Sequence, residues 1–348
     1  MATVDLPLAG TIREFHTSDD ELIRSQIFGS GRPAVLRGFV RHWPAVKIRS
    51  PEAWVEYLRR FDSGKPVDAV MTPPEVEGRI FYDEAMQGFN FVRNRLPITA
   101  IAEQVLRYSA FERAPAVAAQ SALIRDCLPG FSQENRLSIL NESILPRIWL
   151  GNAITTPTHL DEWYNIGCVA TGRRRFTLFP PQQIANLYIG PLDFAPTGAP
   201  MSLVRLHRPD FERFPKFRAA WAAAVSAELG PGDAIFIPPL WWHHVESLER
   251  FNVLVNYWWH AAGTEHATHD KLSAGEGPSG FDVLIHALLN LRSLPPATRE
   301  AWQALFDHFV FGAQSDITGH IPASRHGILG SLSPDDVARW RAYLEGRL

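Results

Sequence analysis

The residues best suited to chemistry lie in two short segments, His159-Leu160-Asp161 and Trp241-Trp242-His243-His244. The first segment stands just before a strand-like run. Because residues two apart on an extended chain point to the same face, His159 and Asp161 can face one metal ion while Leu160 turns away. The second segment follows a Gly-Asp turn and an apolar strand, so it can bring a distant histidine to the same ion.

Two histidines and one carboxylate on one side of a metal leave three positions open, which is the arrangement that non-haem Fe(II) oxygenases use. Taken alone, His159-x-Asp161 is a weak signal, because the chain has 13 histidines and a surface histidine beside a solvated aspartate has the same spacing. The second segment strengthens the prediction. The residues alone leave open which of His243 and His244 is the third ligand, with the other as a core residue or a support for the site.

The elements that must position these residues fall into three zones. Residues 1–115 alternate short strands and helices and form an N-terminal extension. Residues 116–262 contain runs rich in β-branched and aromatic residues, which Gly and Pro interrupt, and which predict short strands. These runs are 148–151, 164–169, 175–179, 234–237 and 252–259. Many short strands with such turns favour a sandwich or barrel. We expect one catalytic core of this kind with helical additions.

The third zone, residues 263–348, is predicted to be helical. Its segments 281–291 and 297–311 are apolar over much of their surface. Because a large apolar patch is rarely left exposed on a monomer, we expect these C-terminal helices to form a homodimer interface.

The bulk composition excludes several classes of protein. The chain has 348 residues, a net charge of −3 and no strongly basic stretch, so we expect no nucleic-acid partner. No run approaches the roughly 18 apolar residues of a membrane helix, and the first 15 residues do not resemble a signal peptide. Two cysteines exclude a disulfide framework and predict a reducing, cytoplasmic location.

Several spaced motifs between residues 30 and 260 together resemble the JmjC-type cupin family, above all its branch with the asparaginyl hydroxylase of hypoxia-inducible factor and bacterial cupin-like proteins. The motifs are Arg32-Pro33-Ala34-Val35-Leu36-Arg37-Gly38, Trp43-Pro44-Ala45, His159-Leu160-Asp161-x-x-x-Asn165, Gly172-Arg173-Arg174-Arg175-Phe176-x-Leu178-Phe179-Pro180-Pro181, Pro231-Gly232-Asp233, Ile237-Pro238, Trp241-Trp242-His243-His244-Val245-Glu246-Ser247-Leu248 and Val255-Asn256-Tyr257-Trp258. The resemblance implies a double-stranded β-helix (jelly-roll or cupin) core with α-helical N- and C-terminal extensions.

The same resemblance implies an Fe(II)- and 2-oxoglutarate-dependent dioxygenase, with iron held by His159, Asp161 and His243. Its default reaction is hydroxylation of a C–H bond in a protein or small molecule, and demethylation is the same chemistry on an N-methyl group. The primary substrate is not readable from the chain. The segments that would choose it, residues 70–115 and 185–220, contain no interpretable motif.

Four further residues are placed in a co-substrate pocket by the resemblance. Thr156 and Arg174 would meet the distal carboxylate of 2-oxoglutarate, and Asn165 and Asn256 would lie near the metal. A buried dicarboxylate needs a cation, and the planar guanidinium of Arg offers two parallel hydrogen bonds. The alternative for Arg174 is a solvated strand face, and for the two asparagines an ordinary place in a strand.

Trp258 and Gln120 are possible lining residues of this pocket, although a core aromatic explains Trp258 equally well. The sequence departs from the family at two positions. Arg174 stands where the family often has Lys, and Ala118 stands where the hydroxylase has a co-substrate tyrosine. The missing tyrosine supports a rival interpretation, a metal-binding cupin that does not turn over. A cupin isomerase or a dioxygenase without co-substrate ranks last, since such sites favour three or four histidines.

Overall fold

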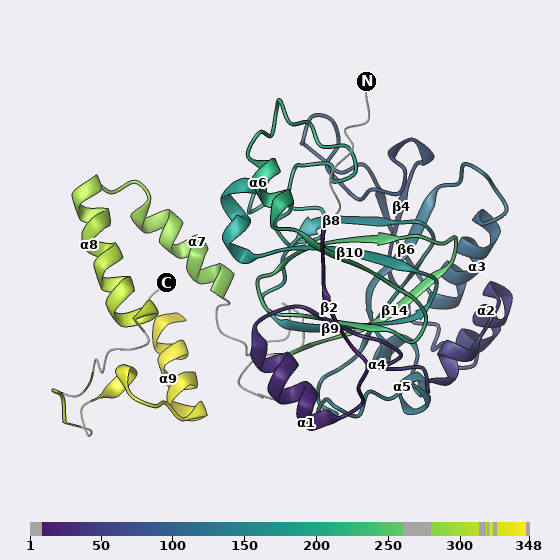
Figure 1. Ribbon diagram of the computed structural model, residues 1–348, viewed down its shortest axis with the longest axis horizontal. Coiled ribbons are helices and arrows are strands. Elements are labelled where there is room, and N and C mark those ends of the chain that lie inside the picture. The colour runs from purple at the N-terminus through teal and green to yellow at the C-terminus, as the bar shows by residue number, and fades with distance from the viewer. Residues whose placement is uncertain (1–8, 260–279, 313–317, 319, 323–325, 346–348) are drawn as a thin grey trace. The chain divides into compact units, whose positions relative to one another are not determined.

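A computed structural model of the chain describes residues 9–259, 280–312, 318, 320–322 and 326–345 (Figure 1). The chain divides into two compact units, Met1–His269 and Asp270–Leu348, and each is described here by itself. The first unit is built on two β-sheets with helices against their outer faces, so the mainly β fold with helical additions predicted from the sequence is confirmed.

The larger sheet contains nine of the strands formed by residues 9–259. In hydrogen-bonding order these are β2 (Arg13–Phe15), β3 (Ala34–Leu36), β12 (Ala234–Ile237), β9 (Tyr164–Thr171), β14 (Asn252–Trp259), β7 (Arg147–Gly151), β6 (Ala116–Leu123), β4 (Val67–Thr72) and β5 (Val92–Leu96). The smaller sheet follows the order β1 (Gly10–Thr11), β11 (Val225–Leu229), β10 (Arg174–Phe179), β13 (Trp242–Ser247) and β8 (Thr155–His159).

The eight strands from β7 to β14 form the predicted double-stranded β-helix. Along the chain they pass between the sheets: β7, β9, β12 and β14 belong to the larger sheet, and β8, β10, β11 and β13 to the smaller. Alternate residues of these strands point into the space between the sheets, where an apolar layer forms. Its members include Phe176, Leu178, Ile235, Val169 and Leu254.

Helices cover the outer faces of both sheets. On the larger sheet, α2 (Pro51–Arg59) and α3 (Ile98–Tyr108) bury Trp54, Leu58 and Ile101 in the main hydrophobic core. The helix α2 begins after Ser50, whose side chain accepts a hydrogen bond from the backbone N–H of Ala53 and so caps the first turn. On the smaller sheet, α6 (Phe217–Ala222) packs against the outward-facing side chains of β10 and β13.

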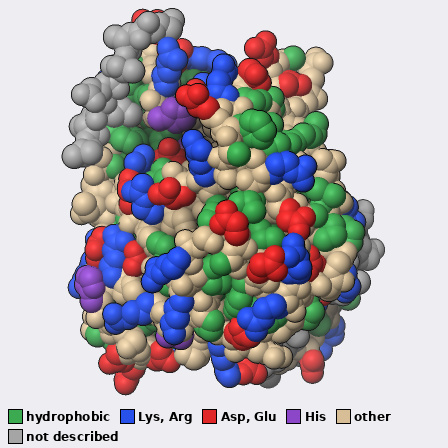
Figure 2. Space-filling view, turned by 90° about the vertical axis from the view of Figure 1, so that its right-hand side faces the viewer, with side chains coloured by type: hydrophobic (Ala, Val, Ile, Leu, Met, Phe, Trp, Pro, Cys, Tyr) green, Lys and Arg blue, Asp and Glu red, His purple; other side chains and the backbone are tan. Residues whose placement is uncertain are grey.

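Strands of the N-terminal zone join the larger sheet directly. β3 pairs with β12 at one side, and β6 pairs with β4 at the other, so residues 34–96 extend the core sheet at both ends. The division at residues 115 and 262 stays a prediction. Figure 2 shows the face at the right of Figure 1, where basic and acidic side chains are interspersed rather than gathered by sign.

The second unit contains α7 (Gly280–Leu291), α8 (Pro296–Phe306) and α9 (Pro334–Glu345). A π-helical turn, η6 (Asp307–Phe311), continues α8. Neither α7 nor α8 has a buried residue, and both leave large apolar side chains exposed. These are Val283, Leu284, Leu289, Trp302 and Leu305. Among the described residues, no helix is both long and apolar enough to cross a membrane.

We propose that a second copy of the chain covers the apolar faces of α7 and α8. Leu289 is 74% exposed, and replacing it by Glu would place a charge in that interface. The Leu289→Glu variant should therefore give monomers or insoluble protein, whereas Asn290→Glu, at the next exposed position, should leave the dimer intact. Light scattering measures both. A wild-type species near the 39.1 kDa mass of one chain at micromolar concentration would contradict the proposal.

Candidate metal centre

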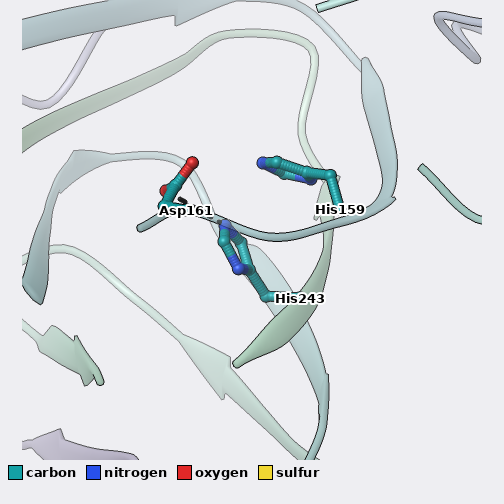
Figure 3. A group of neighbouring side chains, drawn as sticks. All are labelled: His159, Asp161 and His243. Atoms are coloured by element: carbon teal, nitrogen blue, oxygen red, sulfur yellow. Dashed lines mark ion pairs between the residues drawn. The ribbon is translucent and has the colours of Figure 1, made fainter. Parts of the chain in front are cut away.

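The structure brings His159, Asp161 and His243 together at one end of the smaller sheet (Figure 3). His159 ends β8, Asp161 follows it by two residues, and His243 is the second residue of β13. In the antiparallel pairing of the two strands, His159 stands directly opposite His243. One ligand atom from each of the three side chains lies within 4.8 Å of the other two, so a single metal ion can contact all three.

Local sequence explains how the third ligand reaches this place. Pro238 and Pro239 end β12, and the chain turns at Leu240, whose φ of 64° is unusual for a residue with a side chain. The backbone N–H of Leu240 donates a hydrogen bond of 2.8 Å to the carbonyl of Asp161. This bond ties the turn before β13 to the segment that carries the first two ligands.

The two histidines are held in the tautomer that a metal requires. Nδ1 of His159 lies 2.8 Å from the carbonyl oxygen of Pro157, and Nδ1 of His243 lies 3.0 Å from that of Trp241. A carbonyl can only accept, so each Nδ1 must donate its proton. Each Nε2 therefore keeps a free lone pair, as in metal sites whose histidines are oriented by a backbone carbonyl.

Electrostatics also favour a neutral imidazole at His159. Burial, reinforced by the nearby imidazole of His243, lowers the pKa of His159 to about 4. Nε2 of His243 lies 3.5 Å from Oδ2 of Asp161. The hydrogen bonds at Nδ1 thus leave two Nε2 lone pairs beside one carboxyl group, a ligand set that suits Fe(II) and also Mn(II) or Zn(II).

Arg174 enters the layer between the sheets from β10. It is 6% exposed, whereas its neighbours Arg173 and Arg175 are outside and form ion pairs with surface carboxylates. In the described structure no carboxylate pairs with Arg174, its Nε has no hydrogen-bond partner, and its Nη2 lies 3.5 Å from the carbonyl of Trp149. Burial lowers the pKa of Arg174 to about 10, so the side chain stays charged at neutral pH.

Thr156 shares the inner face with Arg174. It pairs with Val245 on β13, and Val245 pairs with Phe176, two residues from Arg174. Cross-strand partners point to the same side of a sheet, so the hydroxyl of Thr156 and the guanidinium both face the space between the sheets. An anion that enters this space from the metal end can meet both groups.

The predicted pocket residue Gln120 and Ala118, the position of the missing tyrosine, both lie on β6. Ala118 is buried in an apolar cluster with Val70 and Ile80, so this position supplies no polar group to the site. Gln120 is half-buried two residues further along the strand. Among the hydrogen bonds of the described residues, none joins Gln120 to the triad or to Arg174. Its role in the pocket stays a prediction.

Asn165 and Asn256 meet beside the metal ligands. The side-chain amide of Asn165 donates to Oδ2 of Asp161 at 3.3 Å, and that of Asn256 donates to Oδ1 of Asn165 at 3.2 Å. The indole N–H of Trp258 also donates to Oδ2 of Asp161, at 3.0 Å. The sequence analysis missed Trp149, whose indole N–H donates to Asn256 at 2.8 Å. The only sequence signal was a tryptophan at an alternating position of a predicted strand.

His244 lies on the other side of β13 from His243. It is 2% exposed, and neither of its ring nitrogens has a hydrogen-bond partner among the described residues. Burial lowers the pKa of His244 to about 3, so the ring is neutral. The structure thus places His243, and not His244, with His159 and Asp161.

Comparisons with known proteins agree with this geometry. The cupin-like domain family matches residues 20–265. Lysine-specific demethylase 8 of Xenopus tropicalis is 26% identical over 254 residues, which are 71% of this chain and 52% of that protein. Jumonji C domain-containing protein 5 of Drosophila melanogaster is 27% identical over 251 residues, 69% of this chain and 57% of that protein.

A shorter match joins the chain to human HSPB1-associated protein 1, with 37% identity over 113 residues, 32% of this chain and 22% of the relative. The matches thus span from about a fifth to somewhat more than half of these relatives. The closer likeness to the asparaginyl hydroxylase branch stays a prediction.

The metal site predicts a clear pattern among histidine variants. Apo protein should bind one Mn(II) or Fe(II) per chain, and replacing His159, Asp161 or His243 by Ala should abolish stoichiometric binding, because two ligands hold a divalent ion poorly. His244→Ala should bind metal as the wild type does, since His244 faces away. Titration of apo protein with Mn(II), with free ion followed by electron paramagnetic resonance, measures this. Metal lost in His244→Ala but kept in His243→Ala would contradict the assignment.

Proposed function

Because the chain belongs to the cupin-like family of JmjC-type domains, we propose that it is an Fe(II)- and 2-oxoglutarate-dependent oxygenase. The observation that carries the proposal is Arg174, a buried cation with no carboxylate partner in the described structure, on the same inner layer as the triad. An unpaired buried charge is costly, and a carboxylate ligand offsets that cost.

The residues of the inner layer have separate tasks in this proposal. His159, Asp161 and His243 would hold Fe(II). Arg174 would bind the distal carboxylate of the co-substrate through two parallel hydrogen bonds, with the hydroxyl of Thr156 beside it. Bound together, iron and a 2-oxo acid supply activation of dioxygen coupled to decarboxylation. The apolar layer of Phe176, Leu178 and their neighbours keeps water out, which strengthens the attraction between the guanidinium and the carboxylate.

We further propose that the primary substrate meets the iron beside the outer edge of β8, the edge that does not pair with β13. The segments 70–115 and 185–220 both attach there: Arg79 forms a bridge with Thr155, and Met201 with His159. Phe89 stacks on Phe194 with ring centroids 4.8 Å apart, which joins the two segments. Between them lies a cleft of about 260 Å³. It is lined by Phe81, Tyr82, Asp83, Glu84, Met86, Leu203 and Arg213.

The expected reaction is hydroxylation of a protein or small-molecule C–H bond. Two relatives bear the name lysine-specific demethylase, a name that describes the activity of those proteins. Removal of an N-methyl group begins with oxidation of its C–H bond, so both outcomes use the same site. The alternative, a metal-binding cupin that does not turn over, is favoured by Ala118, which has no hydroxyl and lies in an apolar cluster.

The first test of the function is co-substrate turnover. Wild-type protein with Fe(II), ascorbate and 2-oxoglutarate should form succinate slowly without a primary substrate, and Asp161→Ala should form none. Succinate is measured by mass spectrometry. A wild-type protein that binds iron but forms no succinate would support the metal-binding cupin instead.

The second test concerns the cation. Arg174→Ala should weaken 2-oxoglutarate binding at least tens-fold, because loss of a buried charge pair costs about 2–5 kcal/mol. Metal affinity should change little. Arg175→Ala is the matched control, since its side chain is 43% exposed and pairs with Glu228 outside the sheet. Calorimetric titration of the Mn(II)-loaded variants measures this. Equal affinities for both variants would mean that Arg174 does not bind the co-substrate.

A further inference from the structure

The carboxylate of Asp161 receives two neutral hydrogen-bond donors on one oxygen. The indole N–H of Trp258 approaches Oδ2 at 3.0 Å, and the amide of Asn165 approaches it at 3.3 Å. Trp258 is 7% exposed and Asn165 is also 7% exposed, so neither donor is easily replaced by water. The terminal torsion of an aspartate is broad, and two donors from different directions fix its plane.

These donors are the end of a longer chain of hydrogen bonds. The side-chain amide of Asn256 donates to Oδ1 of Asn165 at 3.2 Å. The indole N–H of Trp149 in turn donates to Oδ1 of Asn256 at 2.8 Å. Asn256 uses its carbonyl to accept and its amide to donate, so its orientation is fixed from both sides. Nη2 of Arg174 donates to the backbone carbonyl of Trp149 at 3.5 Å. Trp149 therefore links the guanidinium, through its backbone, to the side-chain hydrogen bonds that end at the candidate metal ligand.

We propose that Trp258 and Trp149 are positioning residues for the metal-binding carboxylate of Asp161. Trp258 acts directly through its indole N–H, and Trp149 acts through Asn256 and Asn165. The inference deepens the proposed metal site and rests on it. Neither tryptophan touches the substrate in this proposal, and both work by holding the carboxylate in the orientation that faces His159 and His243.

The chemical type of the donors matters. A lysine or arginine beside Asp161 would orient it equally well, but its positive charge would oppose binding of a divalent cation. Indole and amide groups orient the carboxylate and leave its full negative charge to the metal. Partners of this kind behind a ligand typically change metal affinity by about 10–100-fold when they are removed.

A purely structural role for the two tryptophans makes a different prediction. The rings of Trp149 and Trp258 pack edge to face with centroids 6.1 Å apart, so each contributes to the core by its shape alone. Replacement by Phe keeps a ring and removes the N–H. If packing is the whole role, Phe variants lower the melting temperature of the apo protein and leave the metal site unchanged.

The experiment compares three single variants of the full chain. Trp258→Phe removes the direct donor, and Trp149→Phe removes the distant one. Trp259→Phe is the matched control, because the neighbouring ring packs on Tyr164 and Phe236 at the other face of the strand. Mn(II) affinity of each apo protein is measured by titration, the Co(II) d–d spectrum reports the ligand geometry, and apo melting reports packing.

We expect Trp258→Phe to lower Mn(II) affinity by roughly 10–100-fold and to change the Co(II) spectrum. Trp149→Phe should lower the affinity by a smaller factor, and Trp259→Phe should match the wild type. Unchanged affinity and spectrum in Trp258→Phe would overturn the proposal while leaving the metal site intact. If the wild-type protein bound no metal, the proposed metal site and the positioning role of the tryptophans would both be wrong. Should Trp258→Phe not fold, an unchanged Trp149→Phe would overturn the proposed chain of hydrogen bonds.

Discussion

The antiparallel pairing of β8 with β13 is the interaction on which the whole site depends. It places His159 opposite His243, and the turn before β13 is bonded to the backbone of Asp161. A slip by one residue would turn every side chain of β13 over and present His244 in place of His243. Packing on both faces opposes that slip, because Val245 would leave the apolar layer between the sheets and Trp242 would leave the cluster beneath α6.

Charge within the inner layer is distributed unevenly. At one end, the carboxylate of Asp161 accepts from the neutral donors of Trp258 and Asn165 and lies near the neutral imidazole of His159, which suits a cation. At the other, Arg174 has no carboxylate partner among the described residues, and its lowered pKa reflects the cost of that burial. A bound metal together with an anionic ligand would offset the free-energy cost of burying both the Asp161 carboxylate and the Arg174 guanidinium. Their binding free energy adds to the stability of the folded state, since the unfolded chain has no such site.

The direction in which a strand side chain points can be predicted from the sequence, because side chains alternate between the two faces of a strand. Arg174 faces inward between two outward arginines, and His243 faces the metal while His244 does not, because successive strand residues point to opposite faces. Alternation does not say which strands become neighbours. The strands of residues 34–96 join the main sheet through pairings far apart in sequence, and Trp149 meets Asn256 across 107 residues. Such non-local contacts are not visible in any single segment.

The position of β8 links metal binding to substrate choice. β8 is the last strand of the smaller sheet, and an open edge exposes unpaired backbone groups. Here both predicted substrate segments cover that edge. Ile80 donates to the carbonyl of Thr155 at 3.1 Å, and Ser202 donates to that of Thr158 at 2.7 Å. The strand that ends in His159 is therefore held by its pairing with β13 on one side and by these two backbone bonds on the other. Loops that choose a substrate can change in length and chemistry beyond these anchors, but a change that breaks either anchor loosens a strand that holds a metal ligand.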